Sequence, residues 1–378
     1  MLKKIRNQLK NRFQGNRDNF IGIDIGTRDI KMAEIAPGPL PQVAAIARIA
    51  TPANTIDDGA ILQVDPVVNA IKAMLDQAGS KTQKTVTMIS GRNVITRYIK
   101  LPKMSPKEVA STLKWEADKY IPLSIGTDMI VEHLILGNAE DENPPQINVL
   151  LVGVPRKLIY QVYETFSRAG LELLAVEIEP LSLWRSIGTQ STIRQDFPIG
   201  RDEAFIGLDI GAKATNLAIF QGDDLNFSRY IPMAGDTITH GVAQATGLEF
   251  NAAQVIKERD GEILFGLALD EAPEDKLILD RTIKASLLTL IGEIRRSIDF
   301  YRTQFKKGEP RALVLSGGTA KLKGLPMFLQ QELGLPVVLG LQNISIKEQA
   351  VNKKFKEMKN LDPAFAVAVG LALREVRE

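Results

Sequence analysis

The stretch FIGIDIGTRDI at residues 20–30 has a near-copy, FIGLDIGAKAT, at residues 205–215. In each copy an apolar run rich in isoleucine enters a turn that reads Asp-Ile-Gly, and a second apolar run follows the turn. Two apolar runs joined by a glycine-bearing turn predict a β-hairpin. We therefore interpret the pair as two structural copies of one strand–turn–strand unit.

The residue types in the two turns suit the binding of a polyphosphate. Gly26 and Gly211 have no Cβ, so their backbone N–H groups can approach phosphate oxygens closely. Asp24 and Asp209 directly precede the turns, where a carboxylate can hold a hydrated Mg²⁺ that the phosphates share. One such turn alone would equally fit an ordinary hairpin, whereas two opposed hairpins can grip a polyphosphate from both sides.

Length and composition indicate a multidomain protein without cysteine chemistry. The chain has 378 residues, enough for two or more domains, and a formal net charge of +2 that gives no general reason to expect nucleic acid. The absence of cysteine excludes disulfides and thiolate metal sites and is consistent with a reducing compartment. Because no apolar run reaches roughly 18 residues and the N-terminus does not read as a secretory signal, we expect a soluble cytoplasmic protein.

Residues 1–17 form a basic segment that differs from the rest of the chain. Its lysines and arginines precede any acidic residue, and Leu2, Ile5, Leu9 and Phe13 recur at helical spacing. A basic amphipathic helix of this kind can lie on an anionic membrane surface, with each basic residue adding about 1 kcal/mol. A solvated, frayed tail explains the same pattern equally well.

A third motif, ALVLSGGTAKLKGLPMFL, occupies residues 312–329. An apolar strand at 312–315 runs into Gly317 and Gly318, and a helix is predicted to begin at about Leu325. A strand followed by a Gly-Gly turn lets the backbone pass flat against a nucleotide base or its α-phosphate. The sequence has no G-x-x-x-x-G-K-[ST] motif and no G-x-G-x-x-G after a strand, which excludes a P-loop and a dinucleotide-binding fold.

In this order the three motifs resemble those of the actin, Hsp70 and sugar-kinase ATPase superfamily. The resemblance implies an α/β fold of two actin/Hsp70-like domains with duplicated mixed sheets, and Mg-ATP in the cleft between them. It also implies which residues bind the cofactor. The first phosphate motif supplies Asp24, Gly26, Thr27 and Lys31, the second supplies Asp209, Gly211, Ala212 and Thr215, and the adenosine motif supplies Gly317, Gly318, Thr319 and Lys321. Asp24 and Asp209 are the expected metal ligands.

Three further segments resemble helices of this superfamily. AVEIEPLSLWRSI (175–187) is similar to the first connecting helix, with Glu179 where relatives carry the polar residue that orients attacking water. DPAFAVAVGLALRE (362–375) is similar to the second, its small residues allowing close helix crossing. LIGEIRRSIDFYRTQF (290–305) lies where relatives contact ribose and adenine, which makes Glu293 and Arg296 candidates. An ordinary amphipathic helix with a solvated charged face fits those two residues equally well.

The order of elements over residues 86–171 predicts a small α+β insertion in the first domain. The pattern reads strand, strand, helix, strand, loop, strand, helix, with Pro106 at a favourable first-turn position. The insertion, including WEADKYIPLS (115–124), resembles the extra domain of FtsA and, more closely, that of the PilM family of type IV pilus assembly proteins. The expected units are the segment 1–17, a first domain of 18–85 and 172–195, the insertion 86–171, and a second domain of 204–378.

The PilM resemblance, which covers nearly the whole chain, implies an ATP-binding scaffold that acts in pilus assembly and twitching motility. This scaffold would be a ring or platform component at the cytoplasmic face of the inner membrane, with a homo-oligomer or ring left open. It also implies docking of the N-terminal peptide of a PilN-like membrane protein between the first domain and the insertion. Ile95, Tyr98 and Tyr120 are the candidate groove residues, although plain core positions would look the same. Since ATP can fix the angle between domains without turnover, we expect ATP binding with slow or absent hydrolysis.

Two other functional classes stay open at the level of sequence. An FtsA-like division protein would recruit a division polymer to the membrane, and residues 1–17 are its only support. A small-molecule kinase of the same superfamily would need a catalytic base facing a substrate pocket, for which no segment is visible. His133 and His240 are isolated, which favours structural or solvated roles over catalysis or metal binding.

Overall fold

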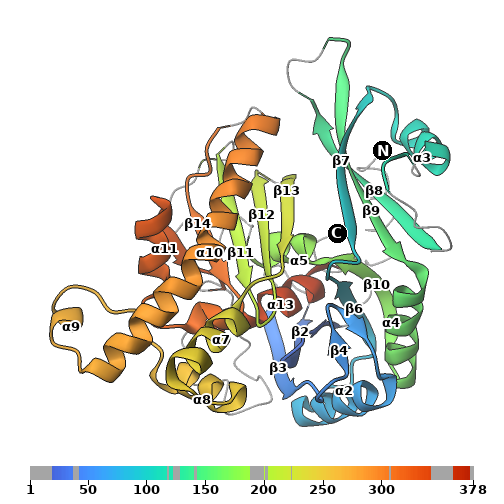
Figure 1. Cartoon of the computed structure of the whole chain (residues 1–378). Coiled ribbons are helices and arrows are strands. Elements are labelled where there is room, and N and C mark those ends of the chain that lie inside the picture. The colour runs from blue at the N-terminus through green and yellow to red at the C-terminus, as the bar shows by residue number, and fades with distance from the viewer. Residues whose placement is uncertain are drawn as a thin grey trace.

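The computed structural model describes residues 19–36, 42–116, 119–121, 128–139, 143–187, 200, 203–222, 224–305, 308–341 and 361–374. Two α/β domains lie side by side, and a smaller sheet projects from the first domain (Figure 1). The basic segment 1–17 and the expected end of the first domain near residue 195 lie outside the described residues.

The first domain is built on a five-stranded sheet in the order β10-β6-β1-β2-β3. Its strands are β1 (Phe20–Ile25), β2 (Asp29–Ala36), β3 (Gln42–Ala50), β6 (Lys84–Ile89) and β10 (Glu172–Ile178), and β4 (Ile56–Asp57) and β5 (Ala60–Ile61) form a small separate hairpin. Helices α2 (Val64–Ala78) and α4 (Arg156–Arg168) pack on one face of the sheet, where they form a buried apolar cluster with Ile21 and Ile23 of β1. Apart from Asp24, strand β1 consists of apolar residues and glycine, because it is buried on both faces.

The second domain repeats this plan with the sheet order β13-β12-β11-β14-β15. Its strands are β11 (Ala204–Ile210), β12 (Thr215–Gln221), β13 (Asp224–Ile231), β14 (Leu313–Ser316) and β15 (Val337–Leu339). Its helices are α7 (Gly235–Thr246), α8 (Phe250–Asp260), α9 (Leu267–Asp270), α10 (Glu274–Phe305) and α11 (Leu325–Leu333), with the short helix η2 (Gly318–Lys321) after β14. Among the described helices, none combines the length and the apolar character needed to cross a bilayer.

The two copies of the FIG-x-DIG sequence occupy equivalent places in the two sheets. Strand β1 pairs antiparallel with β2 and parallel with β6. Strand β11 likewise pairs antiparallel with β12 and parallel with β14. The predicted pair of hairpins and the predicted duplicated mixed sheets are therefore confirmed.

Two short helices cross between the domains, α5 (Glu179–Ile187) and α13 (Ala366–Ala372), the latter preceded by η3 (Pro363–Phe365). A Cβ atom on Gly370 would lie 1.8 Å from the carbonyl oxygen of Ser182, so only glycine permits this crossing. A Cβ on Gly22 would lie 2.0 Å from the carbonyl oxygen of Ala368, because α13 also presses directly on β1. The first glycine of the FIGIDIG motif is thus a helix-packing position, and the second is the turn glycine.

The insertion is a three-stranded antiparallel sheet in the order β7-β9-β8, covered by one helix. Its elements are β7 (Ile95–Pro102), α3 (Pro106–Glu116), β8 (Met129–Asn138) and β9 (Gln146–Pro155), and α3 begins at Pro106 as predicted. Val109 and Leu113 of α3 pack on Val149 and Leu151 of β9 in a core of their own.

The expected limits of the insertion, residues 86 and 171, are wider than the separate sheet. Strand β6 pairs with β1 and β10, so it belongs to the sheet of the first domain. Helix α4 buries Val162 and Phe166 in the core of the first domain. Strand β6 precedes the insertion in the sequence and helix α4 follows it. The sequence pattern alone does not reveal which sheet each of them joins.

Candidate functional site

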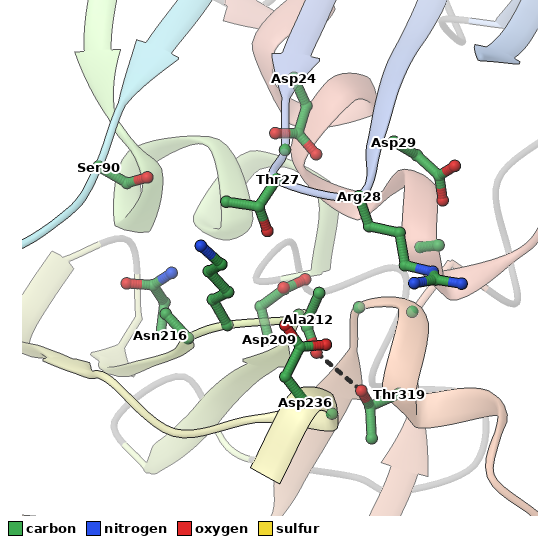
Figure 2. Close-up of a pocket in the computed structure, with 18 of the residues that line it drawn as sticks. Asp24, Thr27, Arg28, Asp29, Ser90, Asp209, Ala212, Asn216, Asp236 and Thr319 are labelled. Atoms are coloured by element: carbon green, nitrogen blue, oxygen red, sulfur yellow. Dashed lines mark hydrogen bonds between the residues drawn. The ribbon is translucent and has the colours of Figure 1, made fainter. Parts of the chain in front are cut away.

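A cavity of about 890 Å³ lies between the two domains, and the three sequence motifs line it. Figure 2 shows Thr27 of the first hairpin on one side and Ala212 and Thr319 of the second domain on the other. The volume is in the range typical of small-molecule sites, about 300–1,000 Å³. One ligand in this cavity can therefore contact both hairpins and the Gly-Gly turn.

The first hairpin is closed by its turn glycine. The Gly26 N–H donates to the Asp29 carbonyl oxygen at 3.1 Å, and the Gly26 carbonyl oxygen accepts from Thr51 Oγ1 at 2.7 Å. A Cβ on Gly26 would lie 2.8 Å from the Asp29 carbonyl oxygen, so a larger residue would open the turn. Thr27 and Arg28, between these contacts, line the cavity.

The second hairpin is held by the elements that follow it. The Gly211 carbonyl oxygen accepts from Thr319 Oγ1 at 2.7 Å and from the Gly235 N–H at 3.2 Å. The Ala212 carbonyl oxygen accepts from the Asp236 N–H at 2.8 Å. The N-terminus of α7 and the Gly-Gly turn therefore fix the position of this hairpin in the cleft.

The Gly-Gly turn requires glycine at its first position. Gly317 has a φ of 90°, and a Cβ there would lie 2.4 Å from the Ile210 carbonyl oxygen. At Gly318 a Cβ would meet no atom within 4 Å, so this residue presents open backbone to the cavity. The first glycine thus serves the fold, and the second leaves space for a ligand.

Three buried carboxylates and one buried ammonium group meet where the domains join. Lys31 Nζ lies 2.6 Å from Asp24 Oδ2. Burial is the largest single effect on the pKa of Lys31 and lowers it, but the charge and hydrogen bond of Asp24, together with the charges of Asp209 and Asp29, raise that pKa overall. Burial raises the pKa of Asp209 to about 6, against the lowering effects of Lys31 and of the hydrogen bond from Ser316. This group of four charges carries an excess of negative charge when all its members are ionised.

Glu179 is the least satisfied member of this cluster. Its Oε2 accepts from Asn216 Nδ2 at 2.6 Å, while its Oε1 is buried and has no hydrogen-bond partner among the described residues. Burial, and then the charges of Asp209 and Asp24, raise the pKa of Glu179 well above its usual range. A buried oxygen without a partner is costly, which indicates that a cation, a water molecule or a ligand completes this site.

The cluster fits a hydrated magnesium ion. In the part of the chain that the structure describes, no three His, Cys, Asp or Glu side chains are arranged to chelate a metal directly. Mg²⁺ does not need such a cage, because it usually keeps several waters and is held by one or two carboxylates together with phosphate oxygens. The excess negative charge and the unpaired oxygen of Glu179 suit this mode of binding.

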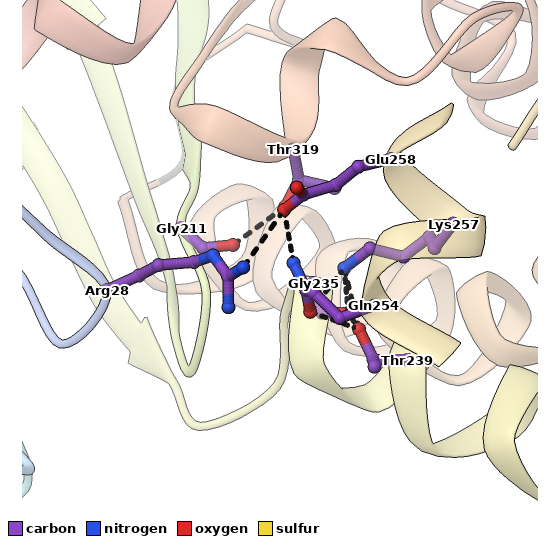
Figure 3. Close-up of polar contacts among 8 residues, drawn as sticks. All are labelled: Arg28, Gly211, Gly235, Thr239, Gln254, Lys257, Glu258 and Thr319. Atoms are coloured by element: carbon purple, nitrogen blue, oxygen red, sulfur yellow. Dashed lines mark hydrogen bonds and ion pairs between the residues drawn. The ribbon is translucent and has the colours of Figure 1, made fainter. Parts of the chain in front are cut away.

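Helix α8 lines the other end of the cavity. Lys257 Nζ donates to the Gly235 carbonyl oxygen at 2.9 Å and to Thr239 Oγ1 at 2.7 Å (Figure 3). Glu258 forms an ion pair with Arg28 of the first hairpin at 3.3 Å, which crosses the cleft from one domain to the other. Because these side chains are about half exposed, the pair contributes little to stability and can separate when a ligand enters.

A family model described as type IV pilus assembly protein PilM matches residues 22–376. The chain belongs to the PilM family. It is also similar to the solved structure of a "PilM-PilN type IV pilus biogenesis complex", with a TM-score of 0.79 and 27% identity over 96% of this chain and 100% of that chain. The match by both sequence and structure extends over almost the whole PilM-family chain.

More distant relatives share the actin-like ATPase fold of this PilM-family chain. The cell division protein FtsA of Streptococcus pneumoniae is 23% identical over 86% of this chain and 76% of its own length. The structure of MreB5 of Spiroplasma citri bound to ADP has a TM-score of 0.53 and 10% identity over 93% of this chain and 94% of that chain. The predicted fold class is confirmed.

The structure brings most of the predicted site residues together in the cavity of this PilM-family chain. The residues from the two hairpins, the Gly-Gly turn and α5 that line it are Asp24, Gly26, Thr27, Lys31, Glu179, Asp209, Gly211, Ala212, Gly317, Gly318, Thr319 and Lys321. Thr215 does not line it, because its side chain is buried and donates to the Met233 carbonyl oxygen at 2.7 Å. Thr215 therefore supports the second hairpin from behind.

The two residues predicted to contact ribose and adenine, Glu293 and Arg296 of α10, lie outside the cavity. Glu293 instead forms ion pairs with Arg229 at 2.7 Å and with Arg296, on the outer side of β13. The structure therefore places these two candidates outside the cavity, on a charged helix face of the kind that the sequence also allowed.

The end of the cavity beside α8 is lined by residues that the sequence patterns did not indicate. Gln254, Lys257 and Glu258 follow one another at i, i+3 and i+4, so they lie on one face of α8. The one sequence signal for them is the polar character of this helix face, since α8 buries only Ala253 and Gln254. No turn or glycine motif marks them, because a helix face needs none.

One candidate groove residue is not on a free surface. Tyr98 is partly buried between the insertion and the second domain, with its ring against Phe227 and Phe305. Ile95 and Tyr120 are partly buried against the core of the insertion. His240 lines the cavity but packs on Phe250 with the ring centroids 4.8 Å apart.

Proposed function

We propose that this PilM-family chain is an ATP-binding scaffold protein of type IV pilus assembly that acts at the cytoplasmic face of the inner membrane. Its partner would be the cytoplasmic N-terminal peptide of a PilN-like membrane protein. The observation that carries the proposal is the convergence of both hairpins, the Gly-Gly turn and Glu179 on one cavity. The family and its similarity to a PilM-PilN complex support the choice of partner.

The cofactor would be Mg-ATP. The backbone of the turns after Asp24 and Asp209 would hold the phosphates, and the two aspartates would hold the hydrated ion. A bound Mg²⁺ neutralises charge on the phosphates. Gly318 and the polar face of α8 would border the nucleoside. The binding of ADP by MreB5, which shares the fold, supports a nucleotide as the cofactor.

Hydrolysis would be slow or absent, well below the usual range of about 1–1,000 per second. Glu179 is the residue that could orient an attacking water, but its raised pKa favours the neutral acid in the ligand-free cleft. We expect Glu179→Gln to keep the hydrogen bond from Asn216 and bind Mg-ATP within about threefold of the wild type. Any slow phosphate release should disappear in this variant, as measured by single-turnover assays with labelled ATP.

The peptide would bind where the insertion meets the first domain. Helix α4, which continues directly from β9 of the insertion, exposes Tyr160 and Tyr163, with 60% and 58% of each residue accessible. Strand β10 lies at the edge of the first sheet and exposes Leu174. An open strand edge flanked by aromatic side chains suits an extended apolar peptide. Ile95 and Tyr120 would stabilise this region from within the insertion.

The deciding experiment is a calorimetric titration of the full chain with a synthetic peptide from the cytoplasmic N-terminus of the PilN-like protein of the same organism. We expect saturable binding, weakened at least tenfold by Tyr163→Ala. Leu267→Ala, at a still more exposed apolar residue of the second domain, is the control and should bind as the wild type. Absence of peptide binding in a protein that still binds Mg-ATP would refute the proposed partner and favour an FtsA-like division role.

A further inference from the structure

Tyr98 joins the insertion to the second domain. Its hydroxyl group lies 3.0 Å from Ser228 Oγ and also accepts the backbone N–H of Ser228. Its ring centroid is 5.7 Å from that of Phe227 and 5.8 Å from that of Phe305. Burial raises the pKa of this tyrosine to about 12, so the hydroxyl stays protonated at physiological pH. The contact combines a hydrogen-bonded pair with an aromatic cluster.

The second-domain side of this contact is the edge strand β13. Ser228 lies in the middle of β13, which pairs only with β12 among the described strands, so the Tyr98 hydroxyl accepts a backbone N–H at the edge of this sheet. Two residues further along the same strand, the Tyr230 hydroxyl donates to Asp58 Oδ1 at 2.7 Å. Tyr230 and Asp58 line the cavity, so β13 runs from the cleft to the insertion.

Gly91 and Arg92 lead from the first domain into the insertion, and we call them its root. Arg92 lines the cavity, as do Asp58 and Tyr230. Asp58 Oδ2 accepts from the backbone N–H of Arg92 at 3.1 Å and from its Nε at 3.0 Å. Gly91 has a φ of 104°, and a Cβ there would lie 2.0 Å from the Asp58 carbonyl oxygen. Asp58 therefore contacts the second domain and the first residues of the insertion at once.

These contacts attach the insertion to the second domain at two points, through Tyr98 directly and through Asp58 at its root. Packed contacts of this kind shift as units and do not stretch continuously. A ligand that changes the angle between the domains moves β13 relative to the first domain, and Tyr98 moves with it. We propose that Tyr98 is a positioning residue that transmits the nucleotide state of the cleft to the insertion and so to the peptide surface beside it.

This inference depends on the proposed binding of nucleotide and peptide, and its test is the ratio of peptide affinities with and without a nonhydrolysable Mg-ATP analogue. For the wild-type full chain we expect a ratio that differs from one by at least about fivefold, the lower end of typical coupling between sites. In Tyr98→Ala the ratio should fall to one while each ligand still binds alone. Tyr98→Phe, which keeps the ring and removes the hydroxyl, should give an intermediate ratio, and Leu267→Ala, at an exposed residue of the second domain, should leave it unchanged. An unaltered ratio in Tyr98→Ala, or a ratio of one in the wild type, would overturn the proposal.

Hydrogen exchange provides a readout that needs no peptide. The amides of β7 and β8 should change their exchange rates when the nucleotide analogue binds to the wild type, and Tyr98→Ala should abolish this response. If the peptide fails to bind but the exchange response depends on Tyr98, the partner is wrong and the coupling stands. If nucleotide binds and the response is the same in both proteins, the coupling is wrong whatever the partner.

Discussion

The two Asp-Ile-Gly turns look equivalent in sequence, yet their aspartates have different surroundings. Across the first hairpin Asp24 pairs in register with Lys31, and across the second Asp209 pairs with Asn216. Lys31 neutralises Asp24, whereas Asn216 turns away to hold Glu179. The duplicated hairpin thus places an ion pair on one side of the cleft and an amide that holds Glu179 on the other.

The pKa of Asp209 predicts how the ligand-free protein responds to pH. Because folding raises this pKa from 3.8 to about 6, the site favours the protonated form, and its contribution to stability is lost as the pH rises through about 6. The ionised carboxylate then costs up to about 3 kcal/mol at pH 7.5. Asp209→Asn should raise the free energy of unfolding at pH 7.5 and flatten its pH dependence between pH 4 and 7, measured by urea unfolding. A variant with the wild-type pH profile would contradict this.

The two lysines of the hairpins predict opposite results on removal. Lys31→Met leaves the buried Asp24 carboxylate without its partner and should cost about 3–5 kcal/mol of stability. Lys213→Met removes the ion pair with Asp57, in which both side chains are at least half exposed, and should cost under about 1 kcal/mol. Urea unfolding of both variants gives the comparison. Equal losses would show that Asp24 does not depend on Lys31.

At the scale of elements, the connecting helices are defined by how closely they approach their neighbours. Helix α13 is buried at every residue and is short, so it has no polar face from which its packing could be inferred. It lies close to α5 and β1 because Gly370 and Gly22 have no side chain at the two contacts. The small residues in its sequence did predict a close crossing, although they did not identify the partners Ser182 and Gly22.

Two helical glycines provide a matched test of this packing. Gly370→Ala should destabilise the protein by more than about 3 kcal/mol, because the added methyl group would overlap the backbone at Ser182. Gly292→Ala, in the middle of α10, meets its nearest atom at 3.9 Å and should stabilise by about 0.5–1 kcal/mol through helix propensity. Thermal unfolding of both variants measures the difference. Two changes of the same sign would refute the assigned crossing geometry.

At the scale of the whole molecule, two kinds of contact join the parts of the chain: exposed ion pairs and a partly buried tyrosine contact. Arg28 with Glu258 and Lys213 with Asp57 cross the cleft on its exposed rim. Tyr98 with Ser228 joins the insertion to the second domain at a partly buried position. The rim ion pairs are exposed and therefore weak, whereas the Tyr98 contact combines a hydrogen bond with aromatic packing.

Ligand binding across the cleft should stabilise the whole chain. At a Mg-ATP concentration about 100 times Kd, linkage adds about 2.7 kcal/mol to the free energy of unfolding. We expect a corresponding rise in the melting temperature with Mg-ATP, a smaller rise with ATP and EDTA, and almost none in Asp24→Asn. Differential scanning calorimetry checks this, with Leu267→Ala as the control that should respond as the wild type. A full response in Asp24→Asn would remove that carboxylate from the proposed cofactor site.

The sequence by itself determined the two hairpins and the Gly-Gly turn, because turns require particular residues at fixed spacing. The connecting helices and Glu179 were indicated by the resemblance of their segments to the ATPase superfamily. The tertiary structure decided what depends on distant segments: that β6 and α4 join the first sheet, that α8 and not α10 borders the cavity, and that Tyr98 faces β13. A charged or aromatic residue on a helix or strand has the same local pattern wherever its element packs. Only the packing of the two domains gives such residues their neighbours.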